Sequence, residues 1–256
     1  MSSKNPTGRG SKLKDQIPQL QAGDKILVGA NDSDIIIPIM GPTGVGKSTF
    51  INTAVGRNVM AVGDSLESCT TNIQYAIVSH PRDASRRVVF VDTPSFDNTS
   101  VDDFEILRRI ALWLAHSYSS QMKLAGVIYL HEISQSRMFG TSRKSLTMFR
   151  RLCGDNALKK VIIATTKWSE VGEKVGIHRE DELMSTFWRE MIGQGSRMAR
   201  FQDTHNSAWD IVDLMVPSDS LPLQIQTEVV DHGKSIHETD AGHTLRPIQN
   251  TTAQPF

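Results

Sequence analysis

Blocks of consecutive apolar residues alternate along the chain with segments whose apolar positions recur every three to four residues. The apolar blocks are short enough for single strands and lie at 35–40, 73–78, 88–91, 125–130, 161–165 and 198–201. The segments with helical spacing lie at 101–118, 146–153, 183–193 and 208–215, and a further one is expected within 223–234. Strands that alternate with helices predict a doubly wound, three-layer α/β sheet.

The blocks at 73–78 and 88–91 are joined by a polar stretch, 81–86, that favours a turn. They therefore predict a hairpin, which places one antiparallel strand at the edge of an otherwise parallel sheet. Asn206 or Ser207 is the expected N-cap of the helix at 208–215.

The strand at 35–40 leads directly into a glycine-rich turn and then into a helix. The turn fits G-x-x-x-x-G-K-[ST] at every position, and reads Gly41, Pro42, Thr43, Gly44, Val45, Gly46, Lys47 and Ser48, followed by Thr49. Its glycines permit backbone angles and close approaches that a Cβ would block. The backbone amides can bind phosphate, Lys47 would reach the β- and γ-phosphates, and Ser48 would ligate Mg²⁺. The stretch predicts a nucleoside triphosphate site.

Composition narrows the class of protein. The 256 residues contain 28 basic and 28 acidic side chains, so charge does not favour a nucleic acid or an anionic membrane as the main partner. No apolar run is long enough to span a membrane, and the N-terminal residues do not resemble a signal peptide. We expect a cytoplasmic protein with a flexible N-terminal tail at 1–33, a nucleotide-binding domain at 34–217, and a C-terminal helix and disordered tail at 218–256.

Asp92 ends the apolar block 88–91 and opens the turn Asp92-Thr93-Pro94. An acid at that position can hold Mg²⁺ through water, opposite the loop that carries Lys47. We therefore place Asp92 with Ser48 at the metal. Phe96 follows shortly after and is expected to pack against the sheet.

Four short segments together resemble the translation-factor-related GTPases. They read GPTGVGKST at 41–49, SCTTN at 68–72, DTPSF at 92–96 and TTKW at 165–168. The similarity is greatest to the septin-like and immunity-associated branch, which includes many fungal G-domain proteins, and it covers about 35–241. It implies a three-layer α/β P-loop NTPase G domain with a mostly parallel six-stranded sheet and one antiparallel edge strand.

The resemblance also implies roles for residues outside the P-loop. Thr70 would be the switch threonine that meets Mg²⁺ and the γ-phosphate, with Thr71 as its competitor. Thr166, Lys167 and Ser169 stand at the positions that read the base, and the loop containing Asp203 and Thr204 would close over it, although that loop is equally well explained as a helix cap.

Ser169 departs from the family pattern, which has an Asp at this position to accept two hydrogen bonds from guanine. A single neutral hydroxyl cannot reproduce a charged bidentate acceptor, and the adjacent Glu170 is a candidate substitute. The sequence thus predicts GTP and GDP as ligands with a weakened preference over ATP. A P-loop ATPase or small-molecule phosphotransferase is the alternative.

Slow turnover is expected, because Phe96 stands where many GTPases have the glutamine that orients the attacking water. Lys47 and Thr70 would stabilise the reacting phosphate. Relatives in this branch pair across their nucleotide faces, so a homodimer could supply Arg137 as a further catalytic group. The output would be a nucleotide-dependent switch that associates with itself or with an effector protein, and a module that holds nucleotide without turnover is a second alternative.

Overall fold

The computed structural model describes residues 23–25, 27, 31, 33–62, 72–96, 101–215 and 221–245. Thr70 and Thr71, and most of the two expected tails, lie outside these residues. Within them the strands form a six-stranded sheet of order β2-β3-β1-β4-β5-β6, in which only the β2–β3 pair is antiparallel. The strands are β1 Ile35–Met40, β2 Gln74–His80, β3 Asp83–Asp92, β4 Val127–Glu132, β5 Val161–Thr166 and β6 Arg197–Arg200. The predicted fold class is confirmed.

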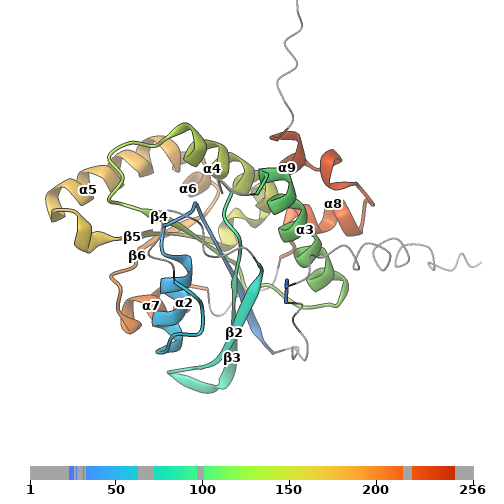
Figure 1. The fold of residues 1–256 in the computed structure, drawn as a ribbon, viewed down its shortest axis with the longest axis horizontal. Coiled ribbons are helices and arrows are strands. Elements are labelled where there is room, and N and C mark those ends of the chain that lie inside the picture. The colour runs from blue at the N-terminus through green and yellow to red at the C-terminus, as the bar shows by residue number, and fades with distance from the viewer. Residues whose placement is uncertain are drawn as a thin grey trace, which may run out of the picture.

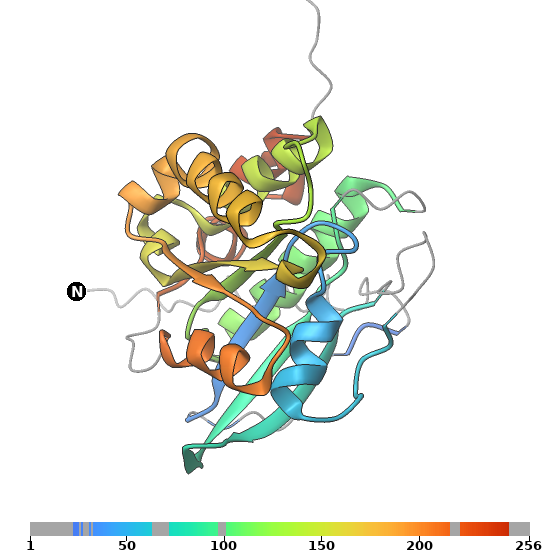
Figure 2. The same cartoon turned by 90° about the vertical axis from the view of Figure 1, so that its left-hand side faces the viewer.

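Helices cover both faces of this sheet (Figures 1 and 2). The longer helices are α2 Lys47–Val55, α3 Asp103–Ser119, α4 Gly140–Cys153, α5 Glu173–Glu182 and α7 His205–Asp213. The shorter ones are α6 Arg189–Gly193, α8 Gln224–Val230, α9 Asp240–His243, the 3-10 turns η2 Asp155–Lys160, η3 Trp168–Glu170 and η5 Ile236–Glu238, and the π-turn η4 Leu183–Phe187. None of the described helices combines the length and apolar character needed to cross a membrane.

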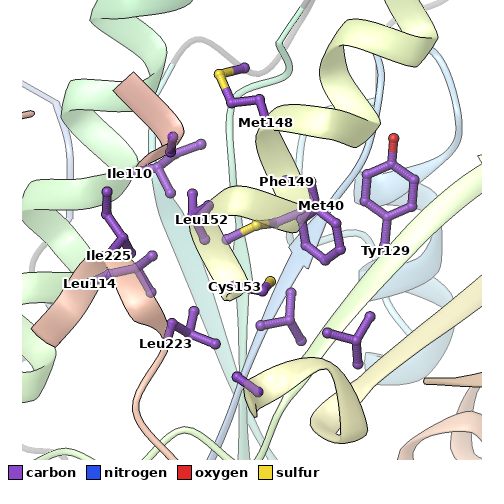
Figure 3. Close-up of a cluster of buried hydrophobic side chains, with 14 of the residues drawn as sticks. Met40, Ile110, Leu114, Tyr129, Met148, Phe149, Leu152, Cys153, Leu223 and Ile225 are labelled. Carbon is purple, nitrogen blue, oxygen red and sulfur yellow. The ribbon is translucent and has the colours of Figure 1, made fainter. Parts of the chain in front are cut away.

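The two faces of the sheet carry separate cores. Ile37, Ile39, Ile128 and Leu130 point toward α2 and α7, whereas Met40 and Tyr129 point toward α3 and α4. Neighbouring residues of a strand point to opposite faces, so an almost wholly apolar strand such as β1 serves both cores. Figure 3 shows the second core, where Leu223 and Ile225 also pack. The C-terminal helix expected within 223–234 is therefore α8, which packs on α3 and α4.

The polar stretch 81–86 is not all turn, contrary to the sequence prediction. β2 continues to His80 and β3 begins at Asp83, so the hairpin is longer and its turn tighter. The reason is a contact with α7, because His80 Nε2 lies 2.8 Å from Asp213 and Arg82 donates to Asp210 at 2.7 Å. The hairpin tip is thereby attached to α7 and stays in the strand conformation.

The helix expected at 183–193 is interrupted, which is a second correction. The π-turn η4, five residues long, separates α5 from α6. The interruption directs Trp188 into the core, where it is fully buried and lies edge-on to His131 with ring centroids 5.4 Å apart. Regular helical spacing cannot signal such a turn, because the tertiary contact of one large side chain selects it.

Candidate functional site

The glycine-rich loop connects β1 to α2 with the backbone angles that its glycines permit. Gly41, Gly44 and Gly46 have φ values of 145°, 78° and 93°, in the region that L side chains rarely adopt. A Cβ on Gly41 would also lie 2.4 Å from the carbonyl oxygen of Leu130 in β4. These glycines are therefore required by the path of the loop.

Lys47 is the first residue of α2, and its side chain folds back across the loop. Its Nζ donates to the carbonyl oxygens of Gly41 at 3.1 Å and Pro42 at 3.0 Å, and to the hydroxyl of Ser95. Lys47 is 6% exposed, so its charge lies inside the loop. Ser95 was not predicted from the sequence, although it lies three residues after Asp92 in the segment that carries the family resemblance.

Ser48 and Asp92, the two predicted metal ligands, lie in direct contact. The Ser48 hydroxyl donates to Asp92 Oδ2 at 2.8 Å, although the two residues come from α2 and from the end of β3. Thr93 holds the following turn against β1 through a 2.8 Å bond to the carbonyl of Ile39. Hydroxyl and carboxylate oxygens are the donors that Mg²⁺ prefers, so this pair fits the metal. No group of three or more His, Cys, Asp or Glu side chains elsewhere in the described chain offers an alternative centre.

Thr166 is the last residue of β5 and lies next to the phosphate loop. It is buried, and its hydroxyl donates to the carbonyl oxygen of Val45 at 2.8 Å. Val45 in turn packs in the core beneath α2. Thr166 thus joins the end of β5 to the phosphate loop, and its part in the base site stays a prediction.

Lys167 follows with φ = 58°, a left-handed conformation that is uncommon for a residue with a Cβ. Its ammonium lies 2.6 Å from Glu132 Oε2 at the end of β4. The sequence prediction gave Glu132 no place in the base site. The signal for it was the parallel pairing of β4 with β5, which sets Glu132 beside Thr166.

The loop after β6 lies close to the turn that carries Ser169 and Glu170. Asp203 has φ = 53°, and partial burial together with the charge of Glu170 raises the pKa of its carboxyl group. Ser169 and Glu170 are exposed in η3. Of the three non-glycine residues with positive φ in the described chain, Lys167 and Asp203 both lie at this end of the sheet. Such strained conformations are concentrated at ligand sites.

Thr204 is the N-cap of α7, which corrects the prediction of Asn206 or Ser207. Its hydroxyl accepts from the Ser207 amide at 3.2 Å, and the Ser207 hydroxyl completes the capping box. Asp203, with its left-handed backbone conformation, ends the preceding segment. The helix therefore begins at His205, earlier in the chain than the sequence predicted. Thr204 therefore has a helix-capping role, whichever ligand the loop contacts.

Phe96 and Arg137 are the remaining residues of the sequence prediction that the structure describes. Phe96 is 3% exposed and belongs to the core beneath α3, so it packs against the sheet as expected. Arg137 is exposed in the connection between β4 and α4, at the mouth of a cavity. Its side chain is accessible from outside the molecule.

Comparison with known proteins matches this arrangement to one family. Residues 36–167, just over half of the chain, match the family described as 50S ribosome-binding GTPase. GTPase Era from Treponema denticola is 29% identical over 111 residues, which are 43% of this chain and 34% of that protein. The chain thus spans about a third of the length of this relative.

Solved structures share the fold at low sequence identity. A structure from the chloroplast translocon components atToc33 and psToc159, for whose GTPase activity dimerization is important, has a TM-score of 0.58 at 12% identity and covers 73% of this chain and 85% of its own. Toc33 from Arabidopsis thaliana in complex with Mg²⁺ and GMPPNP has a TM-score of 0.54 at 16% identity, with coverages of 90% and 95%. The P-loop, its sheet and the family match lead to one conclusion: this chain belongs to the 50S ribosome-binding GTPase family and carries a P-loop GTPase domain.

Proposed function

We propose that this chain binds GTP and GDP with Mg²⁺, hydrolyses GTP slowly and acts as a nucleotide-dependent switch. The observation that carries the proposal is the contact between Ser48 and Asp92 beneath an unbroken P-loop. It brings a hydroxyl and a carboxylate from two elements to the mouth of the loop that holds Lys47.

In this proposal separate residues bind the phosphates, hold the metal and respond to the γ-phosphate. The amides of 44–49 and the Lys47 ammonium bind the phosphates, and their charge stabilises the transferring group. Mg²⁺, when bound, neutralises phosphate charge, and Ser48 would hold it directly while Asp92 holds it through water. Thr70 would complete this shell from the segment 58–72. The segments 58–72 and 93–103 would change order with the γ-phosphate.

Lys167 and the loop around Asp203 support a base site at the same end of the sheet. Lys167 would cover one face of the base with its stem, and Ser169 or Glu170 would accept hydrogen bonds from its edge. Asp203 and Thr204 would close the site from the other side. The two left-handed residues, Lys167 and Asp203, and the raised pKa of Asp203 support this placement.

The choice of base is tested at Ser169. Replacing Ser169 with Asp should increase the preference for GTP over ATP by about 1–3 kcal/mol, because a charged acceptor replaces a neutral hydroxyl. Competition of GTP, GDP and ATP against a fluorescent nucleotide measures the preference. Ser185→Asp is the matched control, since it adds the same charge at an exposed helical serine.

Glu170→Gln separates the two acceptors in the same assay. If Glu170 supplies the missing acid, this variant should lose the GTP preference that the parent shows. An unchanged GTP-to-ATP ratio in both the Ser169 and the Glu170 variants would contradict the proposed base site and favour the ATPase alternative.

We further propose that two copies pair across their nucleotide faces, as in the septin-like and immunity-associated branch. The dependence of GTPase activity on dimerization in the Toc proteins supports this proposal. Phe96 is buried, so the water-orienting group must come from elsewhere. Arg137 is exposed and can reach a second molecule.

Pairing predicts that the hydrolysis rate per molecule rises with protein concentration. The single copy should turn over well below the rates of about 1–1000 per second of typical enzymes. Arg137→Ala should flatten the rise without weakening nucleotide binding, whereas Arg86→Ala, an exposed arginine on β3, should not. Single-turnover assays alongside sedimentation provide the measurement. A constant rate per molecule while sedimentation shows dimers would refute activation by pairing.

A further inference from the structure

A cavity of about 250 Å³ lies between the end of β4, the connection that follows it, the first turn of α4 and the α5–η4 segment. The polar residues used below line it: His131, Gln135, Arg137, Arg143, Arg179 and Glu182. Its volume is below the roughly 300–1,000 Å³ of sites for drug-sized ligands, so it suits a small metabolite.

The cavity is separate from the phosphate site. Ile128 and Leu130 of β4 face α2 and the P-loop, whereas Tyr129 faces α4. His131 follows two residues after Tyr129 and so points to the α4 face, away from the P-loop. Its edge-on contact with Trp188, between η4 and α6, agrees with this direction.

His131 lines the cavity, and one of its ring nitrogens is buried without a partner. The residue is 3% exposed, and its Nδ1 has no hydrogen-bond partner. Burial lowers the pKa of the imidazole to about 4, so the ring is neutral at physiological pH and can present an N–H at Nδ1. A buried, unpaired polar atom is costly, and a ligand that bonds to it removes this cost.

The rim of the cavity is strongly basic. Within the described residues, none of the guanidiniums of Arg137, Arg143 and Arg179 forms an ion pair. Three guanidiniums against the one carboxylate of Glu182 leave two net positive charges. The first turn of α4, which carries Arg143, has no acidic residue and no side-chain cap, so its amides add to the positive potential. The net charge of this rim favours an anion with two negative charges.

The shape of the rim is held by contacts that leave the charges available. Arg179 Nη1 donates to the carbonyl oxygens of Ile133 at 3.0 Å and Ser134 at 2.7 Å, which fixes one wall. Arg143 lies over the ring of Phe187 at 4.8 Å. Both guanidiniums are thus positioned before a ligand arrives, which reduces the entropy cost of binding.

Two side chains at the cavity carry hydrogen-bond acceptors, which favours a ligand with a hydrogen-bond donor. Gln135 donates to Glu132, but its own Oε1 is buried without a partner. The Glu182 carboxylate lines the cavity as well. A simple anion would leave the Gln135 oxygen unsatisfied, whereas a hydroxyl or amino group could donate to it or to the exposed Glu182 carboxylate.

We propose that this cavity is a binding site for a small organic dianion that also carries a hydroxyl or amino group. Two carboxylates would meet the arginines and His131, and the hydroxyl or amino group would donate to Gln135 or Glu182. The inference does not rest on the proposed GTPase cycle, because neither the cavity nor its ligand involves the P-loop.

The test uses the full chain loaded with GDP and Mg²⁺, so that the P-loop does not take up the added anion. L-malate, succinate and inorganic phosphate serve as probes; malate and succinate differ by one hydroxyl. L-malate should shift the imidazole NMR signals of His131 and should bind about fivefold more tightly than succinate by calorimetry, or about 1 kcal/mol. Inorganic phosphate should bind more weakly than L-malate.

Variants then locate the site. Arg143→Gln should weaken the binding of L-malate by at least about fivefold. Arg151→Gln, on the same helix but outside the cavity lining, should not change this affinity. His131→Phe keeps the volume and removes the nitrogen, and should weaken binding without lowering the thermal midpoint. The proposal is overturned if no probe shifts the His131 signals, or if Arg143→Gln binds L-malate as the parent does. Equal binding of malate and succinate overturns the hydroxyl requirement, and tighter binding of phosphate overturns the organic acid.

Discussion

Lys47→Ala is expected to lower the affinity for GTP and GDP at least tenfold, about 1.4 kcal/mol, while the fold is retained. The Lys47 ammonium lies inside the loop, within hydrogen-bonding distance of the carbonyls of Gly41 and Pro42. The ammonium is therefore held close to where the β- and γ-phosphates lie in a P-loop. Alanine removes this positive charge, and nothing replaces it. Titration with a fluorescent guanine nucleotide measures the loss.

The control for this variant is Lys174→Ala, because Lys174 is an exposed lysine of α5. It should bind nucleotide as the parent does. Circular dichroism and the unfolding midpoint establish that Lys47→Ala is folded. Unchanged nucleotide affinity in a folded Lys47→Ala protein would mean that the loop is not the nucleotide site.

Arg109→Ala is expected to lower the free energy of unfolding by about 3–5 kcal/mol, since it leaves a buried carboxylate without its counter-charge. The Arg109 and Asp24 side chains are 1% and 0% exposed. Arg109 donates through Nε to Asp24 at 2.9 Å and also to Asn72 at 2.9 Å. The contact joins α3 to a segment that precedes the sheet and to Asn72, two residues before β2.

Asp24 also accepts a hydrogen bond from the backbone of the residue that precedes β2. Its Oδ1 accepts from the amide of Ile73 at 2.7 Å, and the Lys25 amide donates to the Ile73 carbonyl at 2.9 Å. The segment around Asp24 is thus fastened to Ile73, the residue that directly follows the proposed switch segment 58–72.

Arg108→Ala is the matched control for this stability prediction. Arg108 neighbours Arg109 but pairs with Glu105 at the surface, with side-chain exposures of 22% and 29%, so its loss should cost less than about 1 kcal/mol. Urea unfolding of both variants gives the comparison. The double variant Asp24→Leu/Arg109→Leu should recover part of the loss, because no unpaired charge remains. Equal midpoints for Arg109→Ala and Arg108→Ala would contradict the role assigned to the buried pair.

The order of strands and helices and the phosphate loop could be predicted from the sequence because their determinants are local. A parallel strand buried on both faces must be apolar throughout, as β1 is, and the loop needs its glycines and its lysine at fixed spacing. The long helix α3 and the strands β4 and β5 follow from the same short-range patterns. Their ends, and the π-turn η4, depended on contacts that periodicity does not contain.

The site was completed by contacts between residues far apart in sequence. Ser48 meets Asp92 across 44 positions, Lys47 meets Ser95 across 48, and Thr166 meets Val45 across 121. The Thr166 hydroxyl, buried at the end of β5, donates to the backbone carbonyls of Val45 and His131, and a local sequence pattern does not contain these contacts.

The sequence by itself determined that this chain has a P-loop, a sheet of alternating strands and helices, and an altered base motif at Ser169. Only the tertiary structure decided which oxygens surround Lys47, that Asp24 and Arg109 form a buried pair across 85 positions, and that His131 ends a basic cavity. The physical reason is that a motif constrains neighbouring backbone angles, whereas burial, ion pairing and cavity shape arise when separate elements pack and exclude water.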